Sequence, residues 1–277
     1  MPFHLPKDQR KTAVIAGIIG NVMEWYDFAL YGFMASLISE LFFPEGNRMA
    51  SLIATYGIFA AGFLMRPLGS ALFGWFGDTV GRSKTMLISV SLMTFPTFLL
   101  GILPTYSHIG LWAPAGLVVI RLIQGLSVGG EFSSSVTYLV ETSPKGKRGL
   151  SGSWANVGSM GGMLLGSGVA TLMTTVLSHE ALTGWGWRVP FLFAAVLGTA
   201  AVYLRRHLPK SEHFQKHEQE RGETSPIKEA VTVNIKETLQ AVLFASAYGA
   251  IFYISLVYIP TWLKEYVDTA MGTSMDF

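Results

Sequence analysis

The chain has 277 residues, of which 50% are hydrophobic and 14% are charged, and its mean hydropathy is +0.41. A soluble domain carries about a quarter charged residues, so this composition indicates a protein that crosses a membrane several times. The net charge of +2, with no basic stripe bearing interleaved aromatic residues, argues against a nucleic-acid partner. The absence of cysteine excludes disulfides, thiolate metal sites and cysteine nucleophiles.

Stretches of about 20 mostly apolar residues can cross the hydrocarbon core of a bilayer as helices. Seven are predicted, at residues 13–38, 50–76, 85–103, 113–139, 151–177, 188–204 and 239–262. Residues 205–238 are polar and mix both signs of charge. The sequence therefore predicts an all-α polytopic membrane protein: a six-helix bundle over residues 1–204, a cytoplasmic hydrophilic linker over 205–238, and a seventh helix over 239–277 that begins a truncated second bundle.

Lysine and arginine residues predict the orientation, because cytoplasmic loops are enriched in them. With the N-terminus in the cytoplasm, most of the 20 fall in cytoplasmic segments, Arg205 being counted with the linker, and the outer loops keep only Arg48 and Lys264. We therefore expect a multi-pass protein of a bacterial-type inner membrane with a cytoplasmic N-terminus.

The first predicted segment contains two carboxylates, Glu24 and Asp27, in the stretch G-N-V-M-E-W-Y-D-F. At a rise of about 1.5 Å per residue, both lie near the middle of the membrane, at a depth similar to that of Arg66 in the second segment. Neighbouring carboxylates in an apolar setting disfavour each other's ionisation, so one of them could bind and release a proton. Arg66 or Arg121 could pair with the deprotonated carboxylate; a permanent structural ion pair is the alternative.

Other polar and aromatic residues of the predicted helices are weaker candidates. Glu131, in the fourth segment, is a second candidate proton site. Residues that could line a substrate site are Trp25, Tyr26, Tyr31 and Gln124, with helix packing as the alternative for the aromatic residues. Arg188, at the start of the sixth segment, suits a packing or interface role. Gly158, Gly162 and Gly166 recur every fourth residue, which predicts close contact with another helix.

Two motifs carry a resemblance to a known superfamily. The loop G-W-F-G-D-T-V-G-R-S-K, residues 74–84, resembles the major facilitator superfamily signature G-x-x-x-D-R-x-G-R-R/K, and R-L-I-Q-G, residues 121–125, resembles its fourth-helix signature. The matching loop residues, which the resemblance makes a gating loop, are Gly74, Asp78, Gly81 and Arg82. Thr79 and Ser83 depart from the pattern.

Longer stretches narrow the resemblance to the metabolite:proton symporter family, which includes proline/betaine, 2-oxoglutarate, citrate and shikimate transporters. They are the first-segment pattern, F-L-M-R-P-L-G (63–69), Q-G-L-S-V-G-G-E (124–131) and G-W-G-W-R-V-P-F (184–191). Residues 141–154 favour the proline/betaine branch, whereas residues 121–131 favour the 2-oxoglutarate branch. The resemblance implies proton-coupled symport of a zwitterionic osmolyte first, and of an organic acid second.

Members of this family have twelve helices, so the chain resembles the N-terminal half plus one helix. One alternative is that a separate chain supplies the other half of the transporter. Another is that the chain is an inactive truncated fragment. The expected partners are a small-molecule substrate and membrane lipid, and the proton is the coupling ion, with no other cofactor. The sequence contains no phosphate-binding loop motif, so it does not indicate ATP-driven transport, and we do not expect an enzyme. His213 and His217 have metal-ligand spacing, but a solvated linker explains them better, so no metal site is predicted.

Overall fold

A computed structural model describes residues 7–44, 46–206, 232 and 234–255. The chain divides into two compact units, Met1–Arg221 and Gly222–Phe277. Most of the predicted linker, with His213 and His217, lies outside the described residues, as do residues 256–262 of the seventh predicted segment. The predicted domain boundaries therefore stay predictions.

All regular structure in the described part of the chain is helical. The first unit contains α1 (Lys7–Phe33), α2 (Ala35–Phe42), α3 (Arg48–Leu64), α4 (Arg66–Thr79), α5 (Arg82–Ile102), α6 (Tyr106–Ile109), α7 (Trp112–Glu141), α8 (Arg148–Val176), α9 (His179–Ala181), the π-helical turn η1 (Leu182–Gly186) and α10 (Arg188–Arg205). The second unit contains α13 (Ile235–Tyr253).

Within the described residues, five helical stretches are long and apolar enough to cross a membrane. They are Arg48–Thr79, Arg82–Ile102, Trp112–Glu141, Arg148–Val176 and Arg188–Arg205, which correspond to the second to sixth predicted segments. The first and seventh predicted segments form helices α1 and α13, but these are not among the five. The prediction of an all-α polytopic membrane protein is confirmed.

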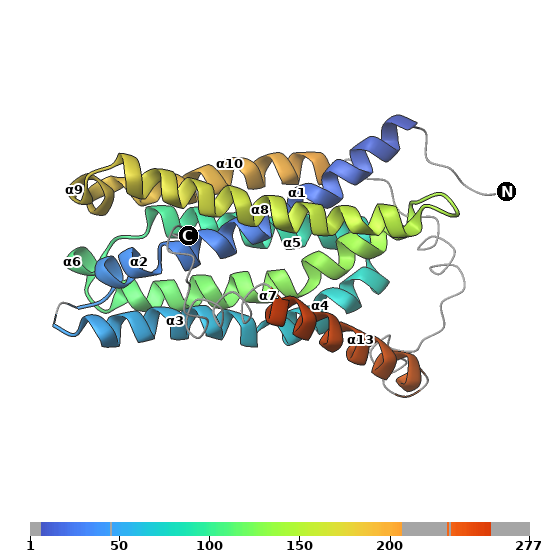
Figure 1. The fold of residues 1–277 in the computed structure, drawn as a ribbon, viewed down its shortest axis with the longest axis horizontal. Coiled ribbons are helices and arrows are strands. Elements are labelled where there is room, and N and C mark those ends of the chain that lie inside the picture. Colours follow the sequence, from blue (N-terminus) through green and yellow to red (C-terminus); the bar gives the residue numbers. More distant parts are fainter. Residues whose placement is uncertain (1–6, 45, 207–231, 233, 256–277) are drawn as a thin grey trace, which may run out of the picture. The chain divides into compact units, whose positions relative to one another are not determined.

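The long helices of the first unit lie alongside one another as a bundle (Figure 1). Helix α1 packs against α8, α7 and α10, while α5 packs against α7 and α10, and α4 packs against α7. The apolar core at one end of this bundle includes the fully buried aromatic residues Tyr26, Tyr31, Phe42, Trp187 and Phe191. Helix α1 therefore lies in the centre of the unit, with the two carboxylates facing other helices.

Glycines of α8 explain how closely α1 and α8 approach. A side chain at Gly158, Gly162 or Gly166 would collide with the backbone of α1, at Ile18, Val22 and Tyr26 respectively. The predicted packing role of this glycine stripe is confirmed. Because α1 is held along a smooth face, the positions of its carboxylates are fixed by backbone contact.

The second predicted segment is interrupted at Met65, which separates α3 from α4. Pro67 follows in the first turn of α4, and its ring nitrogen cannot donate the hydrogen bond that would continue α3. In addition, the Met65 N–H donates to the Gly62 carbonyl, three residues back, at 3.3 Å. This break places Phe63 and Arg66 on two different helices.

Candidate functional site

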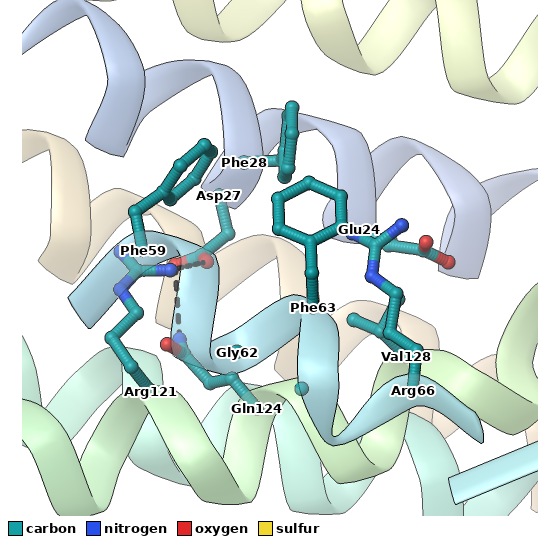
Figure 2. Close-up of a pocket in the computed structure, with 11 residues that line it drawn as sticks. Glu24, Asp27, Phe28, Phe59, Gly62, Phe63, Arg66, Arg121, Gln124 and Val128 are labelled. Atoms are coloured by element: carbon teal, nitrogen blue, oxygen red, sulfur yellow. Dashed lines mark hydrogen bonds and ion pairs between the residues drawn. The ribbon is translucent and has the colours of Figure 1, made fainter. Parts of the chain in front are cut away.

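Asp27 is the centre of a buried polar network that joins three helices. Its Oδ2 accepts a hydrogen bond from Arg121 Nη1 of α7 at 2.7 Å, which is also an ion pair. Its Oδ1 accepts from Gln124 Nε2 at 3.0 Å and from Thr97 Oγ1 of α5 at 3.1 Å. The Gln124 amide also donates to Thr97 Oγ1 at 2.7 Å. Both carboxylate oxygens are thus satisfied in this arrangement, part of which is drawn in Figure 2.

Arg121 keeps unused hydrogen-bonding capacity beside Asp27. Its guanidinium lies 3.8 Å from the centre of the Tyr31 ring, and the Tyr31 hydroxyl donates to the Thr55 carbonyl at 3.1 Å. The Nε and Nη2 atoms of Arg121 are buried and have no hydrogen-bond partner among the described residues, and the same holds for Gln124 Oε1. Buried polar groups are normally paired, so these atoms are available to a ligand or to ordered water.

A small pocket opens beside this network, between α1, α3, α4 and α7 (Figure 2). The cavity of about 30 Å³ is lined by Glu24, Asp27, Phe28, Phe59, Gly62, Phe63, Arg66, Arg121, Gln124, Gly125 and Val128. Five of the predicted site residues therefore line one pocket: Glu24, Asp27, Arg66, Arg121 and Gln124. The pocket brings together two carboxylates and two guanidinium groups, whose charges sum to zero.

Glu24 is buried one turn before Asp27 on α1, with only 4% of its surface exposed. Its Oε2 has no hydrogen-bond partner within the described part of the chain. The charged groups that act on it are Arg66, Glu131 and Arg205. Asp27 pairs with Arg121, which is one of the pairings that the sequence suggested, and Asp27 is not among the charged groups that act on Glu24.

Three phenylalanines form the aromatic side of the pocket, and we call Phe28, Phe59 and Phe63 the aromatic cluster. Their ring centres are 4.7 Å apart for Phe28 and Phe59, 5.2 Å for Phe28 and Phe63, and 5.4 Å for Phe59 and Phe63. The guanidinium carbon of Arg66 lies 4.1 Å from the centre of the Phe63 ring and 5.4 Å from that of Phe28. Sequence reasoning missed this cluster, because phenylalanine in an apolar helix gives no distinctive signal.

Glu131 belongs to a second buried network, with Arg205 as its partner. The Nη1 and Nη2 atoms of Arg205 donate to the two carboxylate oxygens at 2.8 and 2.5 Å, and Ser89 donates to the same carboxylate at 2.9 Å. Arg205 also donates to the backbone carbonyls of Ala16 and Met86. The sequence counted Arg205 with the linker, but in the structure it is the last residue of α10, is 1% exposed and ties α10 to α1, α5 and α7.

Other predicted site residues lie outside the pocket lining. Tyr26 is fully buried and donates to the Pro190 carbonyl at 2.9 Å, and the Trp25 ring packs 5.6 Å from that of Phe28. Tyr31 contacts the site through its ring face, over which the Arg121 guanidinium lies. Arg188 donates to two carbonyls at the end of α5. That contact agrees with the packing role expected for Arg188.

The predicted gating loop is a separate feature between α4 and α5. Arg82 donates to Asp78 at 2.7 Å, so this pair of motif residues ties the end of α4 to the first residue of α5. Gly81 has a φ of +101°, a backbone conformation that side-chain-bearing residues rarely adopt. Gly74 contacts nothing at the position of a Cβ. The motif thus fixes the local turn, and its gating role stays a prediction.

Comparisons with known proteins agree with this fold and site. A family model described as "Sugar (and other) transporter" matches residues 12–251. The chain therefore belongs to this transporter family of the major facilitator superfamily, and it is a multi-pass membrane protein and not an enzyme.

Similar curated proteins come from both branches that the sequence suggested. A proline/betaine transporter of Salmonella typhimurium is 38% identical over 265 residues, which are 92% of this chain and 53% of that protein. An alpha-ketoglutarate permease of Escherichia coli is 40% identical over 267 residues, covering 95% of this chain and 59% of that protein. The chain thus spans about half the length of these relatives.

Solved structures support the fold. The proton:xylose symporter XylE, bound to 6-bromo-6-deoxy-D-glucose, superposes with a TM-score of 0.69 at 18% identity, covering 77% of this chain and 48% of that one. An inward-open structure of XylE from E. coli gives a TM-score of 0.65. At this identity the likeness concerns the fold alone.

Proposed function

We propose that the chain forms the N-terminal part of a proton-coupled symporter for a small zwitterionic osmolyte of the proline/betaine type. The observation that carries this proposal is the pocket whose two carboxylates and two guanidinium groups cancel in charge. A zwitterion has no net charge, so the substrate itself adds no charge to this neutral site, whereas an anion would add a charge that is costly there unless it is compensated. The 38% identity to a proline/betaine transporter supports the same substrate class.

The substrate carboxylate would bind Arg121. The Nε and Nη2 atoms of that guanidinium lack hydrogen-bond partners among the described residues, and a guanidinium can hold a carboxylate through two parallel bonds. Gln124 would support the same end of the substrate, since it lines the pocket one helical turn away.

Asp27 would couple this binding to the proton. A proton taken up from water on Oδ2 neutralises the carboxylate and removes its ion pair with Arg121, whose Nη1 lies 2.7 Å away. The released guanidinium then serves the substrate, and loss of the proton restores the pair. Glu24 and Glu131 are further candidates for proton binding, because both are buried carboxylates.

An organic acid of the 2-oxoglutarate or citrate type is the second candidate substrate. The 40% identity to an alpha-ketoglutarate permease favours it, and Arg66 and Arg121 could each hold one carboxylate. Its binding would require protons on Glu24 and Asp27 to compensate the added charge. Competition for uptake among proline, glycine betaine, 2-oxoglutarate and citrate separates the two candidates.

The proposed cellular setting is a bacterial-type inner membrane with a cytoplasmic N-terminus, supported by the distribution of lysine and arginine. Alternating access in such transporters needs two bundles around one site. The second bundle would come from further chain or from a separate polypeptide. The alternative is an inactive fragment, and uptake by proteoliposomes containing this chain, with and without the C-terminal half of a relative, decides between them.

Substitution of Asp27 tests the coupling. In proteoliposomes that take up labelled proline, Asp27→Asn should abolish uptake driven by a pH gradient and preserve exchange of internal for external proline. Glu40→Gln is a matched control, because Glu40 is exposed and pairs with His179 at the surface. Unchanged gradient-driven uptake by the Asp27 variant would remove Asp27 from the coupling role.

A further inference from the structure

We infer that the aromatic cluster of Phe28, Phe59 and Phe63 is the subsite for an alkylated ammonium group of the substrate, a position that the Arg66 guanidinium occupies in this structure. The inference rests on the proposed function and deepens it, because it names the residues that recognise the cationic end of the zwitterion. It also predicts a preference among cations of different chemistry.

The geometry of Arg66 is the first reason. Its guanidinium carbon lies 4.1 Å from the centre of the Phe63 ring and 5.4 Å from that of Phe28, within the range of cation–π attraction. The rings therefore already hold a cation of about the size of an alkylated ammonium. Replacement of one cation by another preserves the electrostatic attraction to the ring faces.

The position of the cluster within the pocket is the second reason. All three rings line the same cavity as Asp27 and Arg121. In Figure 2, Phe63 and Phe28 lie between the Asp27–Arg121 pair and Arg66. A small zwitterion could thus place its carboxylate on the N–H groups of Arg121 that lack a partner among the described residues, and its ammonium on the rings. The cavity of about 30 Å³ would enlarge as the Arg66 side chain moves off Phe63.

The chemistry of the lining distinguishes between ammonium groups. A quaternary ammonium has no N–H to donate, so carboxylates and amides recognise it poorly, whereas aromatic faces attract its diffuse positive charge. Rings packed only for structure would accept an uncharged group of the same shape equally well. The charge of the ligand is therefore the variable to test.

The test compares glycine betaine with 3,3-dimethylbutyrate, which has the same shape and carboxylate but carbon in place of the cationic nitrogen. Equilibrium binding of both is measured to the full-length chain in lipid nanodiscs. We expect the wild-type chain to prefer glycine betaine by about 10-fold or more, in line with a desolvated cation–π contact. Phe63→Leu should reduce this preference severalfold, and Phe63→Trp should retain it.

Phe76→Leu is the matched control, because Phe76 is a half-buried residue of α4 that contacts Phe73 and Trp75 away from the pocket. It should leave the preference unchanged. Phe28→Leu provides a second cluster variant, and circular dichroism selects the variants that retain native helicity.

The outcomes separate the inference from the proposed function. If the wild-type chain binds glycine betaine without preference over 3,3-dimethylbutyrate, or if Phe63→Leu and Phe28→Leu both keep the preference, the inference is overturned and the symporter proposal stands. If the wild-type chain, reconstituted with the C-terminal half of a relative, binds neither glycine betaine nor proline, the zwitterion proposal fails and the inference fails with it.

Discussion

Replacement of Arg205 by methionine should destabilise the bundle more than any surface substitution. The side chain is fully buried and makes four hydrogen bonds, two of them to Glu131. Arg205→Met removes the charge partner and leaves the Glu131 carboxylate buried, with the Ser89 hydroxyl still donating to it at 2.9 Å. Breaking a buried pair by removing one partner costs about 3–5 kcal/mol of the free energy of unfolding.

Unfolding of the chain in mixed micelles by increasing dodecyl sulfate, followed by tryptophan fluorescence and circular dichroism, measures this cost. Glu40→Gln is the reference, because the Glu40–His179 pair is exposed and such pairs contribute about 0–1 kcal/mol. The double variant Glu131→Gln, Arg205→Met should recover part of the loss, since no charge is left buried. If Arg205→Met costs no more than Glu40→Gln, the Glu131–Arg205 pair does not hold the helices together.

Three more substitutions test the packing around α1 in the same unfolding assay. Gly20→Ala should cost about as much as Arg205→Met, because the added Cβ would overlap both members of the Glu131–Arg205 pair; equal stability to wild type would contradict this. Gly162→Val should separate α8 from α1 and cost about 1–3 kcal/mol as overpacking, whereas Gly161→Val, which meets open space, should cost less. Tyr26→Phe should cost about 1 kcal/mol through the lost bond to a carbonyl of α10, and a wild-type value would show that this bond is dispensable.

The charged residues of the pocket could be predicted from sequence because a charge inside an apolar helix is conspicuous. Glu24, Asp27, Arg66 and Arg121 stand out in this way, and the structure places all four around one cavity. Which carboxylate pairs with which arginine could not be predicted, since helical spacing does not fix the rotation of one helix against another. Asp27 and Arg121 are 94 residues apart and meet only through the packing of α1 on α7.

Arg205 shows the limit of reasoning from loops. It stands at the end of an apolar run and is followed by Arg206 and a polar segment, a pattern typical of a cytoplasmic border. A helix that ends inside the bundle gives the same pattern. Neutral partners such as Thr97 and Ser89 were also missed, because a single hydroxyl residue in a membrane helix has many uses besides hydrogen bonding to a carboxylate.

The break at Met65 interrupts the second membrane segment beside the pocket. Phe63 belongs to α3, before the break, and Arg66 to α4, after it, yet the ring and the guanidinium are in contact. Bending at Met65 would change that contact directly. A ligand that displaces the guanidinium from the ring would therefore also remove a contact that holds α3 and α4 together across the break. Substrate recognition would then be coupled to the angle between α3 and α4.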